Sequence, residues 1–296
     1  MANGTTRLNV TEFDFDRVKT NLKTFLKAQT EFKDYDFEGS GMNILLDTLA
    51  YNTHYLGFNA NMLANEMFLD SAALRSSVVS HAKTLGYEPT SCRAPVATVN
   101  ISLETESPTK TMVAGTAFTT TIDDESYQFV TIADVTASNT GNAVIFKDTR
   151  IYEGSYITTK YTVDSTDVDQ RFTLLDSRAD TSTLTVKVQN SSTDTTSFTY
   201  TKATDITQVT SDSNVYFLQE TFGGKFEVYF GDGVIGKKVI DNNIIILEYV
   251  VTNEEKANGA IKWKSSGSIA TVSDIDVVRV QRSSGGSKPE SLQSIK

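Results

Sequence analysis

The chain has few of the residues that most often carry catalysis, cross-linking or metal binding. Among its 296 residues there are one cysteine, Cys92, and two histidines, His54 and His81. A single thiol cannot form an internal disulfide, which fits a reducing compartment. A catalytic or metal site needs several convergent side chains, and neither histidine lies at a known motif spacing from a cysteine or carboxylate. We therefore predict no enzyme activity, no metal site and no cofactor.

Concentrated positive charge and long apolar runs are also missing. Acidic residues number 37 against 27 basic ones, giving a formal net charge of −10, and the longest basic cluster is Lys237-Lys238. Binding to a phosphate backbone needs a basic surface, so nucleic acid is not an expected partner. No apolar run approaches the length of a membrane span, and the N-terminus lacks a signal-peptide pattern. We expect no membrane association. We also expect the protein to be synthesised in a cytoplasm.

Residue periodicity changes near residue 93 and predicts an α+β fold. An N-terminal helical region, 1–92, precedes a mainly antiparallel β region. The β region is expected to begin with residues 93–150. Its first strand is predicted from alternation, with four apolar residues alternating with polar ones: Ala97, Val99, Ile101 and Leu103. Residues 151–215, rich in Thr, Ser and Asp, are expected to form an inserted or appended β subdomain. Residues 216–296 would complete the main β domain.

The helical region shows unusual apolar patterns. A first helix, capped by Asp14, carries a narrow apolar stripe: Phe15, Val18, Leu22, Phe25 and Leu26. A second helix runs from an N-cap at Ser40 to about Glu66 and carries two broader stripes. Their members are Leu45, Leu49, Leu56 and Leu63 in one, and Ile44, Tyr51, Tyr55, Phe58 and Met62 in the other.

A third line on the second helix consists of small residues seven apart: Ala50, Gly57 and Ala64. Small residues allow another backbone to approach closely. A third helix, Ser71 to Leu85, is expected to bury Leu74, Val78 and Leu85. Three helices in one chain cannot cover all of this apolar surface, so the stripe of the first helix and the small line of the second are candidate interfaces with other chains.

The β region centres on the stretch 226–236. Phe226, Val228 and Phe230 alternate with polar or aromatic residues, as in a half-buried strand. Residues that tolerate positive φ follow, and they are expected to form a structural turn: Gly231, Asp232, Gly233 and Gly236. We predict that this turn closes a hairpin with a second strand at 244–251.

Two other readings of the polar β segments remain open at this point. A β-rich adhesin would bind host glycan or protein, with Tyr156, Tyr161 or Tyr200 exposed. A cell-wall hydrolase would need a carboxylate pair in a cleft, and Asp232 has no second member that the sequence identifies. The acidic run 164–169 lacks the glycine and distal glutamate of an EF-hand loop, so a solvated turn is expected there.

Several short motifs together resemble a known family. They are Phe230-Gly231-Asp232-Gly233, Ile246-Leu247-Glu248-Tyr249, Ala257-Asn258-Gly259, Gly285-Gly286 with Glu290-Ser291, and, in the helical region, Asn65 to Asp70 and Leu85-Gly86-Tyr87. In this order and spacing they resemble the baseplate J family, and most of all its T-even-like wedge subunits. Asp241-Asn242-Asn243 stands where members usually have a glycine.

The resemblance implies a structural role in a virion. Members are wedge proteins of contractile-tail bacteriophage baseplates that join wedges into a ring around the tail tube and rearrange when sheath contraction is triggered. It implies other copies of the chain as partners, a second wedge protein sharing a helical bundle, and adjacent tail proteins such as the sheath initiator. Assembly would take place in the host cytoplasm. Because family members continue with further domains, the chain is expected to be a fragment of a longer protein.

Overall fold

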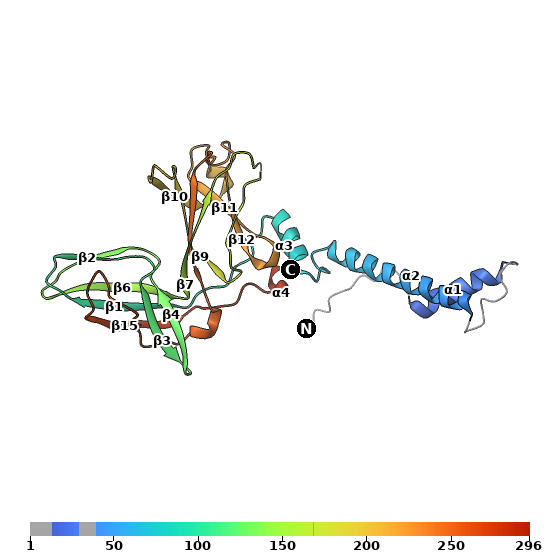
Figure 1. Cartoon of the computed structure of the whole chain (residues 1–296), viewed down its shortest axis with the longest axis horizontal. Coiled ribbons are helices and arrows are strands. Elements are labelled where there is room, and N and C mark those ends of the chain that lie inside the picture. The colour runs from blue at the N-terminus through green and yellow to red at the C-terminus, as the bar shows by residue number, and fades with distance from the viewer. Residues whose placement is uncertain (1–13, 30–39, 168) are drawn as a thin grey trace. The chain divides into compact units, whose positions relative to one another are not determined.

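The computed structural model describes residues 14–29, 40–167 and 169–296 (Figure 1). They separate into two units. The helical unit consists of the described residues up to Tyr87 together with Leu292–Lys296, and the β unit is Glu88–Ser291. The described helices are α1 (Phe15–Lys27), α2 (Gly41–Glu66), α3 (Arg75–Thr84) and α4 (Leu292–Ile295). With the mainly antiparallel strands that follow, the predicted α+β fold is confirmed.

Local sequence accounts for the bounds of α1 and α2. The hydroxyl of Ser40 accepts a hydrogen bond from the backbone N–H of Asn43 at 3.1 Å, which confirms it as the N-cap of α2. α2 ends at Glu66, as the sequence predicts. Asp14 has the extended backbone of an N-cap, but its side chain makes no capping hydrogen bond.

The third helix is shorter than predicted and packs differently. α3 contributes Val78, Val79 and Ala82 to a small core that also contains Ile295 of α4. Leu74 and Leu85, which we expected to be buried, are 50% and 75% exposed. They flank α3 as its two caps, so neither lies on the face that packs against α4. The prediction for these two leucines is wrong.

The β unit contains two large sheets and one small one. The strands are β1 (Val96–Glu104), β2 (Thr109–Met112), β3 (Ala117–Ile122), β4 (Glu125–Val130), β5 (Val135–Ser138), β6 (Ala143–Glu153), β7 (Ser155–Thr162), β8 (Phe172–Thr173), β9 (Ala179–Gln189), β10 (Ser197–Lys202), β11 (Val215–Glu220), β12 (Phe226–Phe230), β13 (Ile244–Val251), β14 (Lys264–Ser265) and β15 (Ile275–Ser284). Three short 3-10 helices lie between them, Ile206–Gln208, Phe222–Gly224 and Glu254–Ala257. β2 and β5 pair only with each other.

The six-stranded sheet has the order β14-β3-β4-β6-β1-β15. Alternation along β1 places Ala97, Val99, Ile101 and Leu103 in its core, as predicted from the sequence. Phe129 and the chain's single tryptophan, Trp263, pack edge to face in the same core, with ring centroids 5.6 Å apart.

The seven-stranded sheet has the order β7-β13-β9-β10-β11-β12-β8 and a core of its own. All its strands lie between residues 155 and 251, whereas the strands of the six-stranded sheet come before and after this range. The seven-stranded sheet is therefore an insertion into the chain of the six-stranded one. The expected boundary between residues 215 and 216 falls inside β11, so the structure divides the β region differently from the sequence-based division.

The predicted hairpin between 226–230 and 244–251 is wrong. β12 pairs with β11 and β8, while β13 pairs with β7 and β9. After Gly231 the chain contacts the segment before β11, where the N–H of Gly236 donates to the carbonyl of Thr210 at 3.1 Å. The glycines do signal a turn, but β13 has eight residues to pair and finds a full-length partner in β7 rather than in the five-residue β12.

Candidate functional site: the exposed face of helix α2

One face of α2 is covered, and its buried residues are of mixed character. Its buried residues are Asn43, Leu46, Ala50 and Gly57. α1 packs beside the N-terminal part of α2 (Figure 1), and Lys19 of α1 forms an ion pair with Asp47 of α2. Ala50 is fully buried, so this part of the small line is already used within the chain.

The remaining surface of α2 carries many large apolar side chains exposed to solvent, together with the exposed polar residues Thr48, Asn52 and Asn59. Both stripes identified in the sequence lie here: Ile44, Leu45, Leu49, Tyr51, Tyr55, Leu56, Phe58, Met62 and Leu63. Each is between 46% and 67% exposed. Soluble monomers rarely expose this many large apolar side chains on one helix, and such surfaces mark interaction sites. We refer to these nine residues as the α2 apolar face.

The α2 apolar face is not smooth. Tyr51 and Tyr55 lie one helical turn apart, with ring centroids 5.2 Å apart and planes inclined by 48°. A shallow groove of about 460 Å³ lies beside them, lined also by Leu49, Asn52 and Leu56. Its apolar lining with a few amides suits a protein side chain from another helix better than a charged ligand.

The stripe of α1 lies mostly against α2. Phe15, Val18, Leu22 and Leu26 are half-buried, whereas Phe25 is 64% exposed. Ala64, the last member of the small line, is half-buried. Periodicity identified the apolar residues of both helices correctly. It did not predict which face of α2 would be covered. The covered face contains Asn43, Leu46, Ala50 and Gly57, whereas the two large apolar stripes remain exposed.

The turn after β12 is the second site singled out by the sequence. Gly233 and Gly236 have φ values of +94° and +84°. The Asp232 carboxylate accepts hydrogen bonds from the N–H groups of Val234 and Ile235, at 2.8 and 3.0 Å. These backbone donors, Ile235 first, stabilise the ionised form and lower the pKa of Asp232 below its ordinary value of 3.8. Asp232 thus organises the turn itself.

Other candidates from the sequence do not form a site. Cys92 is buried, and burial followed by the nearby Asp180 carboxylate raises the pKa of its thiol to about 12, so it is unreactive in the folded protein. His81 Nε2 lies 2.9 Å from the carbonyl oxygen of Glu66, and His54 is half-buried. Asp164 accepts hydrogen bonds from the backbone and hydroxyl of Thr166, as in a turn.

The tyrosines that would favour an adhesin are not displayed on the surface. Tyr200 is only 5% exposed, and Tyr156 and Tyr161 are half-buried. The hydroxyl of Tyr161 donates to the carbonyl of Thr173 at 2.6 Å. Within the described residues, no group of three or more His, Cys, Asp or Glu side chains could hold a metal ion. No helix in those same ranges is long and apolar enough to cross a bilayer.

Comparison with known proteins gives a consistent result for both units. Residues 14–87 match the family described as the helical domain of baseplate wedge protein gp6-like proteins. Residues 157–262 match the third domain of bacteriophage baseplate wedge protein gp6, a range that takes in most of the inserted seven-stranded sheet. The baseplate wedge protein gp6 of Enterobacteria phage T4 is 30% identical over 313 residues, covering 95% of this chain.

The chain spans 46% of the length of that T4 relative. The two domain matches lie in the relative order expected for one protein, helical domain first and third domain later. Over these ranges the chain is similar to gp6-like bacteriophage baseplate wedge proteins.

Proposed function

We propose that the chain is a structural component of a contractile-tail baseplate wedge and that the α2 apolar face is its main association surface. The observation that supports this most directly is the exposure of nine large apolar side chains on one helix whose opposite face is already covered. Burying apolar surface contributes roughly 25 cal/mol per Å², so a second helix placed along α2 would be strongly favoured.

The proposed partners are other chains with amphipathic helices. We propose other copies of this chain, a second wedge protein that shares a helical bundle, and adjacent tail proteins such as the sheath initiator. The proposed location is the tail baseplate of the virion, after assembly in the host cytoplasm. We further propose that contacts between wedges rearrange when sheath contraction is triggered. Membership in the wider baseplate J family stays a prediction.

The decisive test changes the α2 apolar face without touching its covered face. Leu49→Asp combined with Leu56→Asp places two charges where the proposed bundle would exclude water, and burying each unpaired charge costs several kcal/mol. Light scattering after size-exclusion chromatography should show that the unchanged chain self-associates or binds a co-expressed wedge partner and that the double variant does neither.

A matched control introduces the same two negative charges at other positions of the helical unit. Thr20→Asp with Thr24→Asp alters two exposed positions of α1 and should leave assembly unchanged. Leu22→Asp with Phe25→Asp should weaken assembly less than the α2 pair, because Leu22 is half-buried against α2 while only Phe25 is exposed. Full assembly of the Leu49/Leu56 variant would contradict the proposal.

We also propose that the chain has no catalytic activity. The support is chemical, because the described residues offer no metal-binding group and the single thiol is buried with a raised pKa. Zymography on peptidoglycan with the purified chain should show no clearing. Clearing that one carboxylate substitution abolishes would overturn this part of the proposal and favour a hydrolase.

A further inference from the structure

The polypeptide passes between the two large sheets at two neighbouring points. It leaves the six-stranded sheet at the end of β6, where Glu153 and Gly154 lead directly into β7. It returns after β13, where Thr252 and Asn253 lead toward β14. We call these four residues the neck. An insertion joined by such a pair of crossings can act as a separate body or as a fixed extension, depending on what holds the neck.

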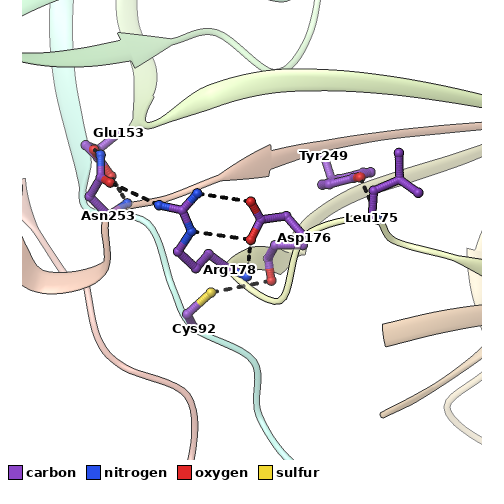
Figure 2. A network of polar contacts seen from close by, with 8 residues as sticks. Cys92, Glu153, Leu175, Asp176, Arg178, Tyr249 and Asn253 are labelled. Carbon is purple, nitrogen blue, oxygen red and sulfur yellow. Dashed lines mark hydrogen bonds and ion pairs between the residues drawn. The ribbon is translucent and has the colours of Figure 1, made fainter. Parts of the chain in front are cut away.

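A fully buried carboxylate joins the two crossings. Glu153 is 0% exposed. One of its oxygens accepts hydrogen bonds from the hydroxyl of Thr252 at 2.7 Å and from the backbone N–H of Asn253 at 2.9 Å, and the other accepts from Asn253 Nδ2 at 2.8 Å. All three donors come from the returning crossing, and Figure 2 shows Glu153 beside Asn253. Hydrogen bonds to a charged acceptor are about twice as strong as neutral ones.

The surroundings of this carboxylate hold the returning crossing in place. The N–H of Thr252 donates to the carbonyl of Arg178, at 3.1 Å. The guanidinium of Arg178 lies between the Asp176 carboxylate and the Asn253 amide oxygen (Figure 2), with contacts of 3.0 and 3.5 Å. Asn253 is therefore fixed from both sides, by Glu153 and by Arg178.

The two crossings also approach too closely to move independently. Gly154 has φ +122°, and a Cβ atom there would lie 2.1 Å from the carbonyl oxygen of Val251. Beside the neck, the N–H of Ala94 donates to the buried Asp180 carboxylate at 2.8 Å. A small apolar cluster of Ala94, Val130 and Val250 joins the same region.

We propose that Glu153 is a buried clamp that makes the six-stranded and seven-stranded sheets fold and move as one body. If the neck opened, the carboxylate would lose three hydrogen bonds at once. A buried group left unsatisfied in this way is costly, so local opening of the insertion is suppressed in favour of unfolding both sheets together. This inference does not depend on the proposed function.

The chain carries a natural reporter for each sheet. Trp263 is its single tryptophan and lies in the core of the six-stranded sheet, so its fluorescence follows that sheet alone. Hydrogen–deuterium exchange of peptides from β9 and β13 follows the insertion. In the unchanged 296-residue chain, both reporters should give the same urea midpoint.

Two neck variants should separate these midpoints. Glu153→Gln replaces one acceptor oxygen by an NH₂ group that must face the Asn253 donors, so exchange in β13 should become faster by at least about tenfold at urea concentrations where Trp263 remains native. Thr252→Val keeps the shape of the side chain and removes one donor. Thr252→Val should separate the midpoints of the two reporters in the same direction but by less. If Glu153→Gln does not fold, Thr252→Val alone tests the proposal.

The matched control is Glu227→Gln, which alters another buried carboxylate, one inside the seven-stranded sheet that contacts Arg171 and Gln219. With the clamp intact, this variant should lower both midpoints together. The proposal is overturned if the reporters already separate in the unchanged chain, or if they stay coincident in the folded neck variants.

Discussion

Helix α2 and strand β13 are built from similar apolar residues that have opposite positions in the fold. In β13, Ile245, Leu247 and Tyr249 are all 0% exposed, because alternation directs them into the core of the seven-stranded sheet. In α2, Leu56 and Leu63 are 62% and 67% exposed, while the small Ala50 is buried. A core that is complete within one chain shields its large apolar side chains from water.

This difference indicates which unit can be stable by itself and which would gain stability from contacts with other chains. The β unit closes its two main cores with its own strands, and its neck is satisfied by its own side chains. In the helical unit, the covered face of α2 includes the small residues Ala50 and Gly57. The nine residues of the α2 apolar face remain exposed to solvent. We infer that the β unit is stable by itself, whereas the helical unit reaches full stability only in an assembly.

The largest expected effect comes from a single substitution at a glycine whose backbone conformation the β unit requires. Gly154→Val places a β-branched side chain at φ +122° against the carbonyl of Val251, and we expect more than about 3 kcal/mol of destabilisation. Trp263 fluorescence and circular dichroism should show loss of the folded β unit. Gly41→Ala, at the start of α2, is the control: its Cβ would meet nothing within 4 Å, so stability should change by less than about 1 kcal/mol. A native-like Gly154→Val variant would refute the geometry of the neck.

A pair of leucine truncations tests the comparison directly. Leu247→Ala removes a fully buried side chain from β13 and should lower the free energy of unfolding by about 2–5 kcal/mol. Leu56→Ala removes an exposed side chain from α2 and should change the stability of a dilute monomer by less than about 0.5 kcal/mol. Urea denaturation at low concentration measures both. Equal losses for the two variants would show that the α2 apolar face is covered within the chain.

A smaller effect is expected at the turn after β12. Gly233→Val should cost about 1–3 kcal/mol because φ is +94°, although the nearest atom to the new Cβ, Lys238 Cβ, is 3.7 Å away. The cost is thus backbone strain and not a clash. Gly233→Asn should lose less, since asparagine tolerates positive φ better. An unchanged melting temperature for the valine variant would show that the turn relaxes freely.

The smallest effect concerns acid stability of the same turn. The pKa of Asp232 is lowered on folding, so its contribution to stability is fully present above 3.8 and is lost as the pH falls through the lowered value. Asp232→Asn should therefore melt slightly below the unchanged chain at pH 7, and the gap should be narrower at an acidic pH below 3.8. Melting curves at the two pH values measure this, and a gap that stays constant would mean that the carboxylate does not stabilise the turn through its charge.

Local patterns predicted much of this fold and little of its long-range pairing. Ser40 as the N-cap of α2 and the alternation of Val99 and Ile101 in β1 depend on neighbours a few residues away, and both predictions are confirmed. The hairpin after Asp232 failed because strand partners are selected by length and core fit across the whole sheet. Gly231 and Gly233 carry no information about that selection.

The candidate site was predictable in composition but not in orientation. The sequence gives α2 two large apolar stripes and a third line of small residues, so periodicity alone left the choice of covered face open. That choice depends on α1, whose Lys19 finds Asp47 on the polar side of α2. The neck was not predictable at all, because Glu153 and Asn253 are 100 residues apart in the sequence and neither lies in a recognisable motif.

The nesting of one sheet inside the other also sets the order in which the chain can fold as it emerges from a ribosome. Every strand partner in the seven-stranded sheet lies within residues 155–251, so that sheet can close once Val251 has been made. β1 appears much earlier but pairs with β15, as far along as Val96 with Ser284. During that interval one side of β1 has no partner strand, and long-range pairing of this kind is slow. The early part of the six-stranded sheet is therefore the segment that spends longest incomplete during synthesis.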